Sequence, residues 1–150
     1  MSEIILDGGN ECYTPKWIFD ALGIEFDLDV ASSYHPLVEV PTKHRYTISD
    51  DALTKQWFGR IWMNPPFSKV TPWIDKWLEH ANGLCLVPTS SNGKWGNKLW
   101  DAKTGCLFLP PNMSFIGASG HIVKHRWRCA LFAIGEQNIE ALRNLGTVKI

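Results

Sequence analysis

The sequence lacks several features that would assign it to common protein classes. It contains no C-x-x-C pair, because its cysteines are widely separated, at Cys12, Cys85, Cys106 and Cys129. Scattered cysteines do not support a zinc or redox motif, and they indicate reduced thiols in a cytosol. No apolar run is long enough to span a bilayer. The first ten residues, MSEIILDGGN, carry acids where a secretory signal carries basic residues. We therefore expect a cytoplasmic protein with no bound metal and no membrane partner.

Chain length and charge distribution indicate the number of domains and the kind of partner. A chain of 150 residues is expected to form one domain, spanning 1–150. The net charge is zero, but residues 1–50 hold nine acids and three bases, whereas residues 51–150 hold six acids and twelve bases. This split indicates a region that faces a polyanion, although surface charges can also segregate by accident.

Hydrophobic spacing predicts short helices that alternate with strands. Helices are expected over 14–23, 71–83 and 137–146, and the first two carry a threonine N-cap followed by proline, at Thr14-Pro15 and Thr71-Pro72. Strands are expected over 24–33, near Arg45–Ile48, and over 60–63, 84–88, 105–110, 127–135 and 147–150. The segments expected to be loops are 92–101, with a helical turn, and 111–126. This order predicts an α/β fold with a mostly parallel sheet flanked by short helices.

Polar residues follow three of the expected strands. In parallel sheets, ligands bind past the carboxyl ends of the strands. Asp29, Asp50 and the segment Asn64–Phe67 each lie at such an end. We therefore expect these residues to share the rim of the sheet on which chemistry takes place.

The stretch RIWMNPPFSK, from Arg60 to Lys69, contains an unusual corner. Two adjacent prolines fix two φ angles, and the first bars Asn64 from helical geometry. The side-chain oxygen of Asn64 and the carbonyl of Pro65 can then accept the two hydrogens of an aromatic amine. Such acceptors would aim the nitrogen lone pair at an electrophilic methyl group, while Phe67 stacks on the base. The alternative is a tight turn with a structural role only.

NPPF at Asn64–Phe67 resembles the catalytic motif of amino-group methyltransferases that use S-adenosyl-L-methionine. The wider pattern resembles the phage-type DNA N6-adenine methyltransferases. The motifs that carry this resemblance are YTPKWIFDAL, FDLDVASS, RYTISDDALTKQW and IWMNPPFSKVTPWIDK, all within residues 11–88. The sequence has no glycine-rich first loop, which this family replaces with the aspartate strand. The short span between Asp29 and Ile61 has no room for two crossover helices, so we expect a trimmed, compact Rossmann-like methyltransferase sheet.

The resemblance implies roles for particular residues. The catalytic corner would comprise Asn64, Pro65, Pro66 and Phe67. Thr14 and Pro15 would hold the methionine end of S-adenosyl-L-methionine, and Asp29, Val30 and Ala31 would line its pocket. Asp50, or its neighbour Asp51, would accept hydrogen bonds from ribose or adenine; each of these acids could instead serve as a cap or turn.

The activity that the resemblance implies is methylation of adenine N6 in double-stranded DNA, in the cytoplasm of a bacterial host if a phage encodes the chain. The base would be flipped out of the duplex. The basic residues expected to contact phosphates are Lys94, Lys98, Lys124, Arg126 and Arg128. Two alternatives stay open: an amino-group methyltransferase acting on RNA or protein glutamine, and a DNA-binding relative without catalysis. The sequence indicates neither the recognised DNA sequence nor the oligomeric state.

Overall fold

The chain folds around a six-stranded sheet. The computed structural model describes residues 4–6, 12–33, 39–66, 68–88, 94–109, 114–117, 122–124 and 129–150. The strand order is β4 (Thr42–Arg45), β3 (Phe26–Asp29), β5 (Ile61–Met63), β6 (Gly83–Pro88), β10 (Cys129–Ile134) and β7 (Gly105–Phe108). Strands β4, β3, β5 and β6 run parallel, and β10 runs antiparallel to both of its neighbours. The prediction of an α/β fold with a mostly parallel sheet is therefore confirmed.

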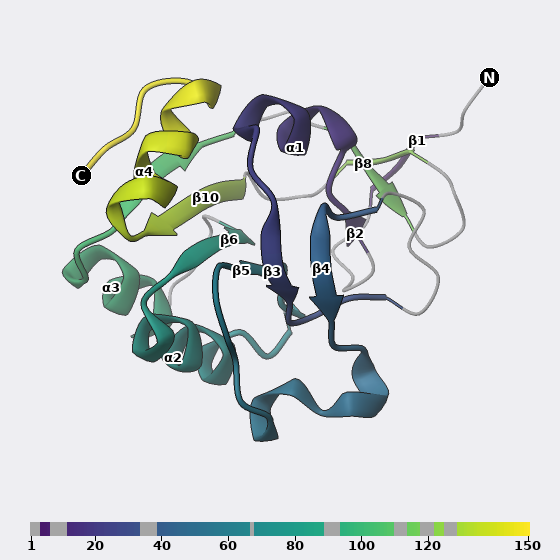
Figure 1. The fold of residues 1–150 in the computed structure, drawn as a ribbon. Coiled ribbons are helices and arrows are strands. Elements are labelled where there is room, and N and C mark those ends of the chain that lie inside the picture. Colours follow the sequence, from purple (N-terminus) through teal and green to yellow (C-terminus); the bar gives the residue numbers. More distant parts are fainter. Residues whose placement is uncertain are drawn as a thin grey trace.

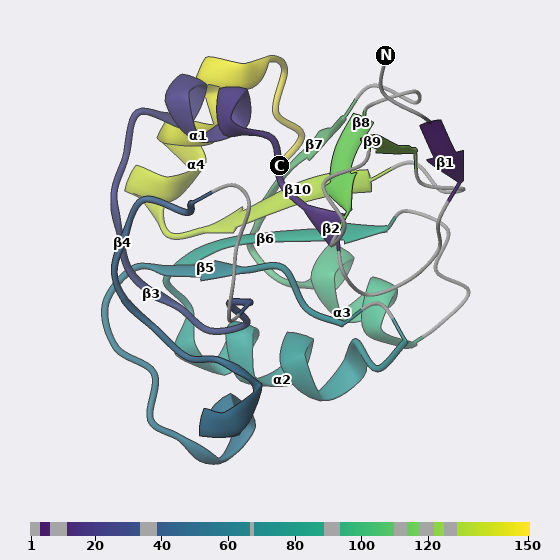
Figure 2. The same ribbon diagram turned by 90° about the vertical axis from the view of Figure 1, so that its right-hand side faces the viewer.

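Helices cover both faces of this sheet (Figures 1 and 2). On one face, α1 (Lys16–Leu22) and α4 (Glu136–Leu142) pack against a cluster that includes Trp62 and Leu131. On the other face lie α2 (Thr71–His80) and α3 (Lys94–Asp101), whose residues join a second buried cluster. Because both faces are covered, every residue of β5 and β6 is buried.

The connections between the first strands of the sheet are short. In the described part of the segment from β3 to β5, the only helical elements are the 3-10 turns η1 (Ile48–Asp50) and η2 (Ala52–Thr54). The predicted trimming of the sheet is therefore confirmed. The expected strand near Arg45–Ile48 lies earlier than predicted, at Thr42–Arg45, and η1 begins at Ile48, after two intervening residues.

A second sheet contains two strands from the segment 111–126, which the sequence predicts to be a loop. Its order is β1 (Ile4–Leu6), β9 (Ile122–Lys124), β8 (Ser114–Gly117) and β2 (Cys12–Tyr13). Strands β8 and β9 pair antiparallel, and the N-terminal strands add to their two edges. Strands β8 and β9 lie between β7 and β10 in the chain, whereas β1 and β2 precede α1. Strand β2 lies near the carboxyl ends of β5 and β6 in both views (Figures 1 and 2).

Two helices begin one residue away from their predicted start, which corrects both threonine caps. The carbonyl of Pro15 accepts a hydrogen bond from the amide of Ile18 at 3.2 Å, so Pro15 is the N-cap of α1. Val70 takes the same position in α2, and Thr71 is the first helical residue. Gly23 ends α1 in the left-handed region with φ 66°, as predicted.

Two C-terminal predictions are also corrected. The segment predicted as a polar loop with one helical turn forms α3, which packs on the sheet through the fully buried Leu99. The strand predicted over 147–150 is only a single bridge, in which Lys149 exchanges backbone hydrogen bonds with Cys106 at 2.7 and 2.8 Å.

Candidate active site

The carboxyl ends of the parallel strands meet at one edge of the large sheet. Strand β3 ends at Asp29, and β5 ends one residue before Asn64. Asp29 is paired in register with Trp62, and the amide of Val30 donates to the carbonyl of Trp62 at 3.2 Å. The Asn64 corner therefore begins two residues beyond the position that faces Asp29, and the predicted shared rim is confirmed for this pair.

Asp29 is a buried acid at this edge, with only 3 % of its surface exposed. Its carboxylate accepts a hydrogen bond from the amide of Ala31 at 3.2 Å. Desolvation by burial raises its pKa from 3.8 to about 7, opposed by the Ala31 amide, the charge of Arg45 and a hydrogen bond with Ser32. The guanidinium of Arg45 is itself paired with Glu39 at 3.3 Å.

No ion pair of Asp29 is found within the described ranges. A buried carboxylate without a cation beside it is costly in its charged form. A positively charged ligand group could therefore pair with Asp29, beyond the more distant charge of Arg45.

Thr14 supplies a second polar group that lacks a partner. The residue is 4 % exposed, and its hydroxyl oxygen has no hydrogen-bond partner among the residues that the structure describes. Thr14 follows β2 directly and precedes Pro15, which is half-buried at the start of α1. Buried hydroxyls are ordinarily bonded, so this oxygen fits a site completed by a ligand.

The corner after β5 is held at both ends. Strand β5 is buried in the sheet, Pro65 is buried, and Asn64 and Pro66 are half-buried. The amide of Lys69 donates to the carbonyl of Pro66 at 3.1 Å, which forms a turn that leads into α2. Phe67, the predicted stacking residue, lies outside the described residues. The stiffness that the two prolines predict for the corner stays a prediction.

Asp50 has a structural partner in the segment after β4. One oxygen of its carboxylate accepts hydrogen bonds from the amide of Thr47 at 2.7 Å and from the Thr47 hydroxyl at 3.3 Å. This is the cap of η1. Asp51 is exposed in the left-handed region, with φ 53°. Asp50 therefore has the capping role that the sequence left open, and its predicted contact with ribose or adenine stays a prediction.

A set of contacts that the sequence does not predict fastens this segment to α2. The indole nitrogen of Trp57 donates to the carbonyl of Ala52 at 2.9 Å. The ammonium of Lys76 lies 5.3 Å from the centre of the Trp57 ring, and it donates to the carbonyls of Leu53, at 3.1 Å, and Lys55. We call these contacts of Lys76 and Trp57 the clamp. The clamp fixes the segment that carries Asp50 to the helix that follows the Asn64 corner.

The predicted phosphate-binding residues are only partly described. Lys98 in α3 forms an ion pair with Asp75 of α2 at 2.6 Å, so its charge is already paired within the protein. Lys94 is the first residue of α3 and Lys124 the last of β9, and only the backbone of these two residues is described. Arg126 and Arg128 lie outside the described residues. Their contacts with DNA stay predictions.

The described residues contain neither a cluster suited to a metal ion nor a helix suited to a membrane. No group of three or more histidine, cysteine, aspartate or glutamate residues there could hold a metal ion. No helix in this part of the chain has both the length and the apolar composition needed to cross a membrane.

The mixed six-stranded sheet, its covering helices and the polar carboxyl edge define a methyltransferase-like α/β protein. The sequence matches the family model described as DNA N-6-adenine-methyltransferase (Dam) over residues 4–149. The chain therefore belongs to the Dam family of DNA N-6-adenine methyltransferases. The match extends well beyond the segment 11–88 that carries the sequence motifs. No curated protein matches the chain.

Proposed function

We propose that this chain transfers a methyl group from S-adenosyl-L-methionine to the N6 amine of adenine in double-stranded DNA, as a single domain spanning 1–150. Membership of the Dam family supports the reaction and the substrate class. The single observation that carries the assignment to this site is the placement of buried Asp29 beside the strand that ends at the Asn64 corner.

The polar groups of the edge fit the cofactor. S-adenosyl-L-methionine carries an ammonium group at its methionine end and supplies the electrophilic methyl group. The carboxylate of Asp29 would accept that ammonium, and the Thr14 hydroxyl would form a second hydrogen bond to the same end. Pro15, Val30 and Ala31 would line the pocket, and Asp50 would bind ribose or adenine through its second carboxylate oxygen.

The corner would orient the adenine amine. The Asn64 side-chain oxygen and the Pro65 carbonyl would accept its two hydrogens, which localises the lone pair on N6 and directs it outward. Because β5 and α2 hold the corner from both sides, these acceptors need no rearrangement during the reaction. Phe67 would stack on the base after it leaves the duplex. Lys94, Lys98, Lys124, Arg126 and Arg128 would contact phosphates, with Lys98 first leaving its ion pair with Asp75.

Incubation of the purified protein with radiolabelled S-adenosyl-L-methionine tests the proposal. Unmethylated duplex DNA, RNA of the same sequence and a glutamine-containing peptide serve as acceptors, and digestion followed by mass spectrometry identifies the product. We expect N6-methyladenine from DNA alone. If the label appears only in RNA or only in the peptide, that molecule replaces DNA as the proposed substrate. If the protein binds DNA but transfers no methyl group to any acceptor, it is a DNA-binding relative without catalysis.

A further inference from the structure

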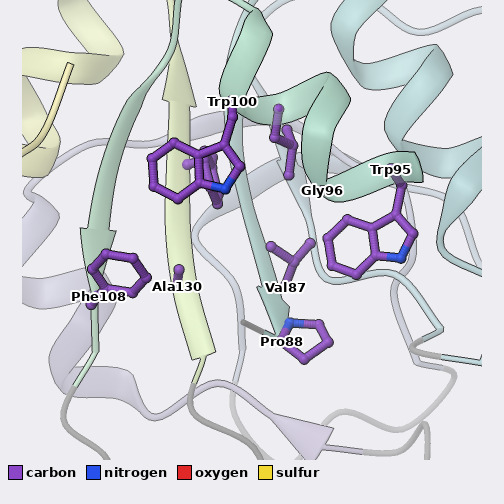
Figure 3. Close-up of a pocket in the computed structure, with 9 residues that line it drawn as sticks. Val87, Pro88, Trp95, Gly96, Trp100, Phe108 and Ala130 are labelled. Atoms are coloured by element: carbon purple, nitrogen blue, oxygen red, sulfur yellow. The ribbon is translucent and has the colours of Figure 1, made fainter. Parts of the chain in front are cut away.

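An aromatic hollow lies next to the candidate site, on the face of the sheet covered by α3 (Figure 3). It has a volume of about 40 Å³. The residues that form it come from β6, α3, β7 and β10, and they include Val87, Pro88, Trp95, Trp100, Phe108 and Phe132. Pro88 ends β6, the strand paired with β5, so the hollow opens at the same edge as the Asn64 corner.

Two aromatic rings of this hollow are exposed although they are large and apolar. Trp100 is 56 % exposed and Phe108 is 43 % exposed, with their ring centres 6.3 Å apart. Trp100 also rests edge-on against Phe132 at 5.8 Å, which holds the indole in place while one part of its surface faces solvent. Exposed aromatic surface beside a hollow is typical of a binding site.

Charge around the hollow favours a polyanion as the ligand. From Lys94 to Lys103 the chain contains three lysines and one acid, Asp101. Lys98 is paired with Asp75 of α2, which leaves Lys94 and Lys103 against Asp101. The exposed residues of α3 beside Trp100 are polar or charged, which leaves the aromatic rings as the apolar surface of this helix. Aromatic rings flanked by basic residues suit a nucleic-acid strand, because the rings stack on the faces of the bases and the basic residues neutralise the charge of the phosphates.

We propose that a base of the bound DNA, unstacked close to the flipped adenine, lies on Trp100 and Phe108 and inserts its edge into the hollow. The volume is too small for a whole base, so the hollow takes an edge while Trp100 carries the face. The inference rests on the proposed function, because it takes DNA as the ligand and places this contact at the carboxyl edge of the sheet, over β10 and β7, beyond the strand that neighbours β5.

The test compares two strands of equal length by fluorescence anisotropy: oligothymidylate, and the same phosphodeoxyribose backbone without bases. Trp100→Ala is expected to weaken the binding of oligothymidylate by about tenfold, the loss typical of one stacked base. Phe108→Ala should act in the same direction. Neither change should alter binding of the abasic strand. Trp17→Ala is the matched control, because Trp17 is 48 % exposed on α1, on the opposite face of the sheet.

Three results would overturn the inference. The first is equal affinity of Trp100→Ala and Trp17→Ala for oligothymidylate, and the second is that Trp100→Ala loses as much affinity for the abasic strand as for oligothymidylate. The third is a dimer in solution that only Trp100→Ala dissociates. The last result would assign the hollow to a second copy of the chain. The binding assay does not depend on methyl transfer. Failure of the proposed function therefore appears separately, as stacking of bases without methylation of any DNA.

Discussion

Asp29 faces Trp62 across the pairing of β3 and β5, and the Val30 amide next to it donates to the Trp62 carbonyl at 3.2 Å. This pairing ties the buried acid of one strand to the strand that carries Asn64. A shift of register would move the two apart, so the sheet itself sets the spacing between the cofactor site and the catalytic corner.

Asp29→Asn should stabilise the protein without ligand while removing cofactor binding. The folded state holds a proton on Asp29 up to a pH of about 7, whereas the unfolded chain loses it near the ordinary pKa of 3.8. The Asp29 contribution to the free energy of unfolding therefore falls as the pH rises from about 4 to about 7, by about 4 kcal/mol. Denaturant titrations at several pH values should show a flatter dependence for Asp29→Asn, and calorimetry should show no saturable binding of S-adenosyl-L-methionine. A variant that binds normally would exclude the proposed contact with the ammonium.

Thr14→Val should separate ligand binding from stability. The change removes a buried hydroxyl that has no partner within the described residues. The free energy of unfolding should therefore rise, by on the order of 1 kcal/mol. Cofactor affinity should fall about tenfold, because one hydrogen bond to the ligand is lost. Thr104→Val is the matched control: Thr104 is also buried, but its hydroxyl donates to the carbonyl of Leu99 at 3.1 Å. This control should destabilise the protein and leave affinity unchanged. Destabilisation by Thr14→Val with normal affinity would contradict the account.

Lys76→Met tests the clamp. Methionine keeps the apolar stem beside Trp57 but cannot donate to the carbonyls of Leu53 and Lys55. We expect faster hydrogen exchange of the Thr47 amide, which caps η1, and a severalfold weaker affinity for S-adenosyl-L-methionine. Lys55→Met, an exposed change on the same segment, should alter neither quantity. If exchange accelerates while affinity stays the same, the clamp is structural and Asp50 does not contact the cofactor.

The sequence predicts the large sheet better than the small one. In β3 the apolar residues Phe26 and Leu28 alternate with acids, and this pattern identifies the strand correctly. The same alternation would expose Asp29, but only 3 % of its surface is exposed in the fold, where β4 and β5 flank its strand. Its raised pKa follows from tertiary structure that no local pattern contains.

The small sheet was missed because its strands are short and their partners are distant in sequence. Strand β2 has two residues and pairs with β8 about a hundred positions later, so neither segment has a detectable period. Helix α3 was missed because Gly96 and Asn97 interrupt its apolar pattern, and its packing through Leu99 offsets their weak helix propensity. The resemblance of NPPF to the methyltransferase motif, in contrast, depends only on consecutive residues, so the sequence alone is enough to identify it.

The turnover of Asn64→Ala, measured together with its melting temperature and its cofactor affinity, tests the central claim most directly. If Asn64 accepts a hydrogen of the adenine amine, turnover should fall about a hundredfold or more. Cofactor affinity should barely change, because the Asn64 side chain would face the base, and Asn64→Asp should recover part of the rate because it keeps an oxygen acceptor. A purely structural corner predicts a lower melting temperature with full specific activity in the folded fraction. That result, a destabilised but fully active Asn64→Ala protein, would contradict the catalytic role of the corner.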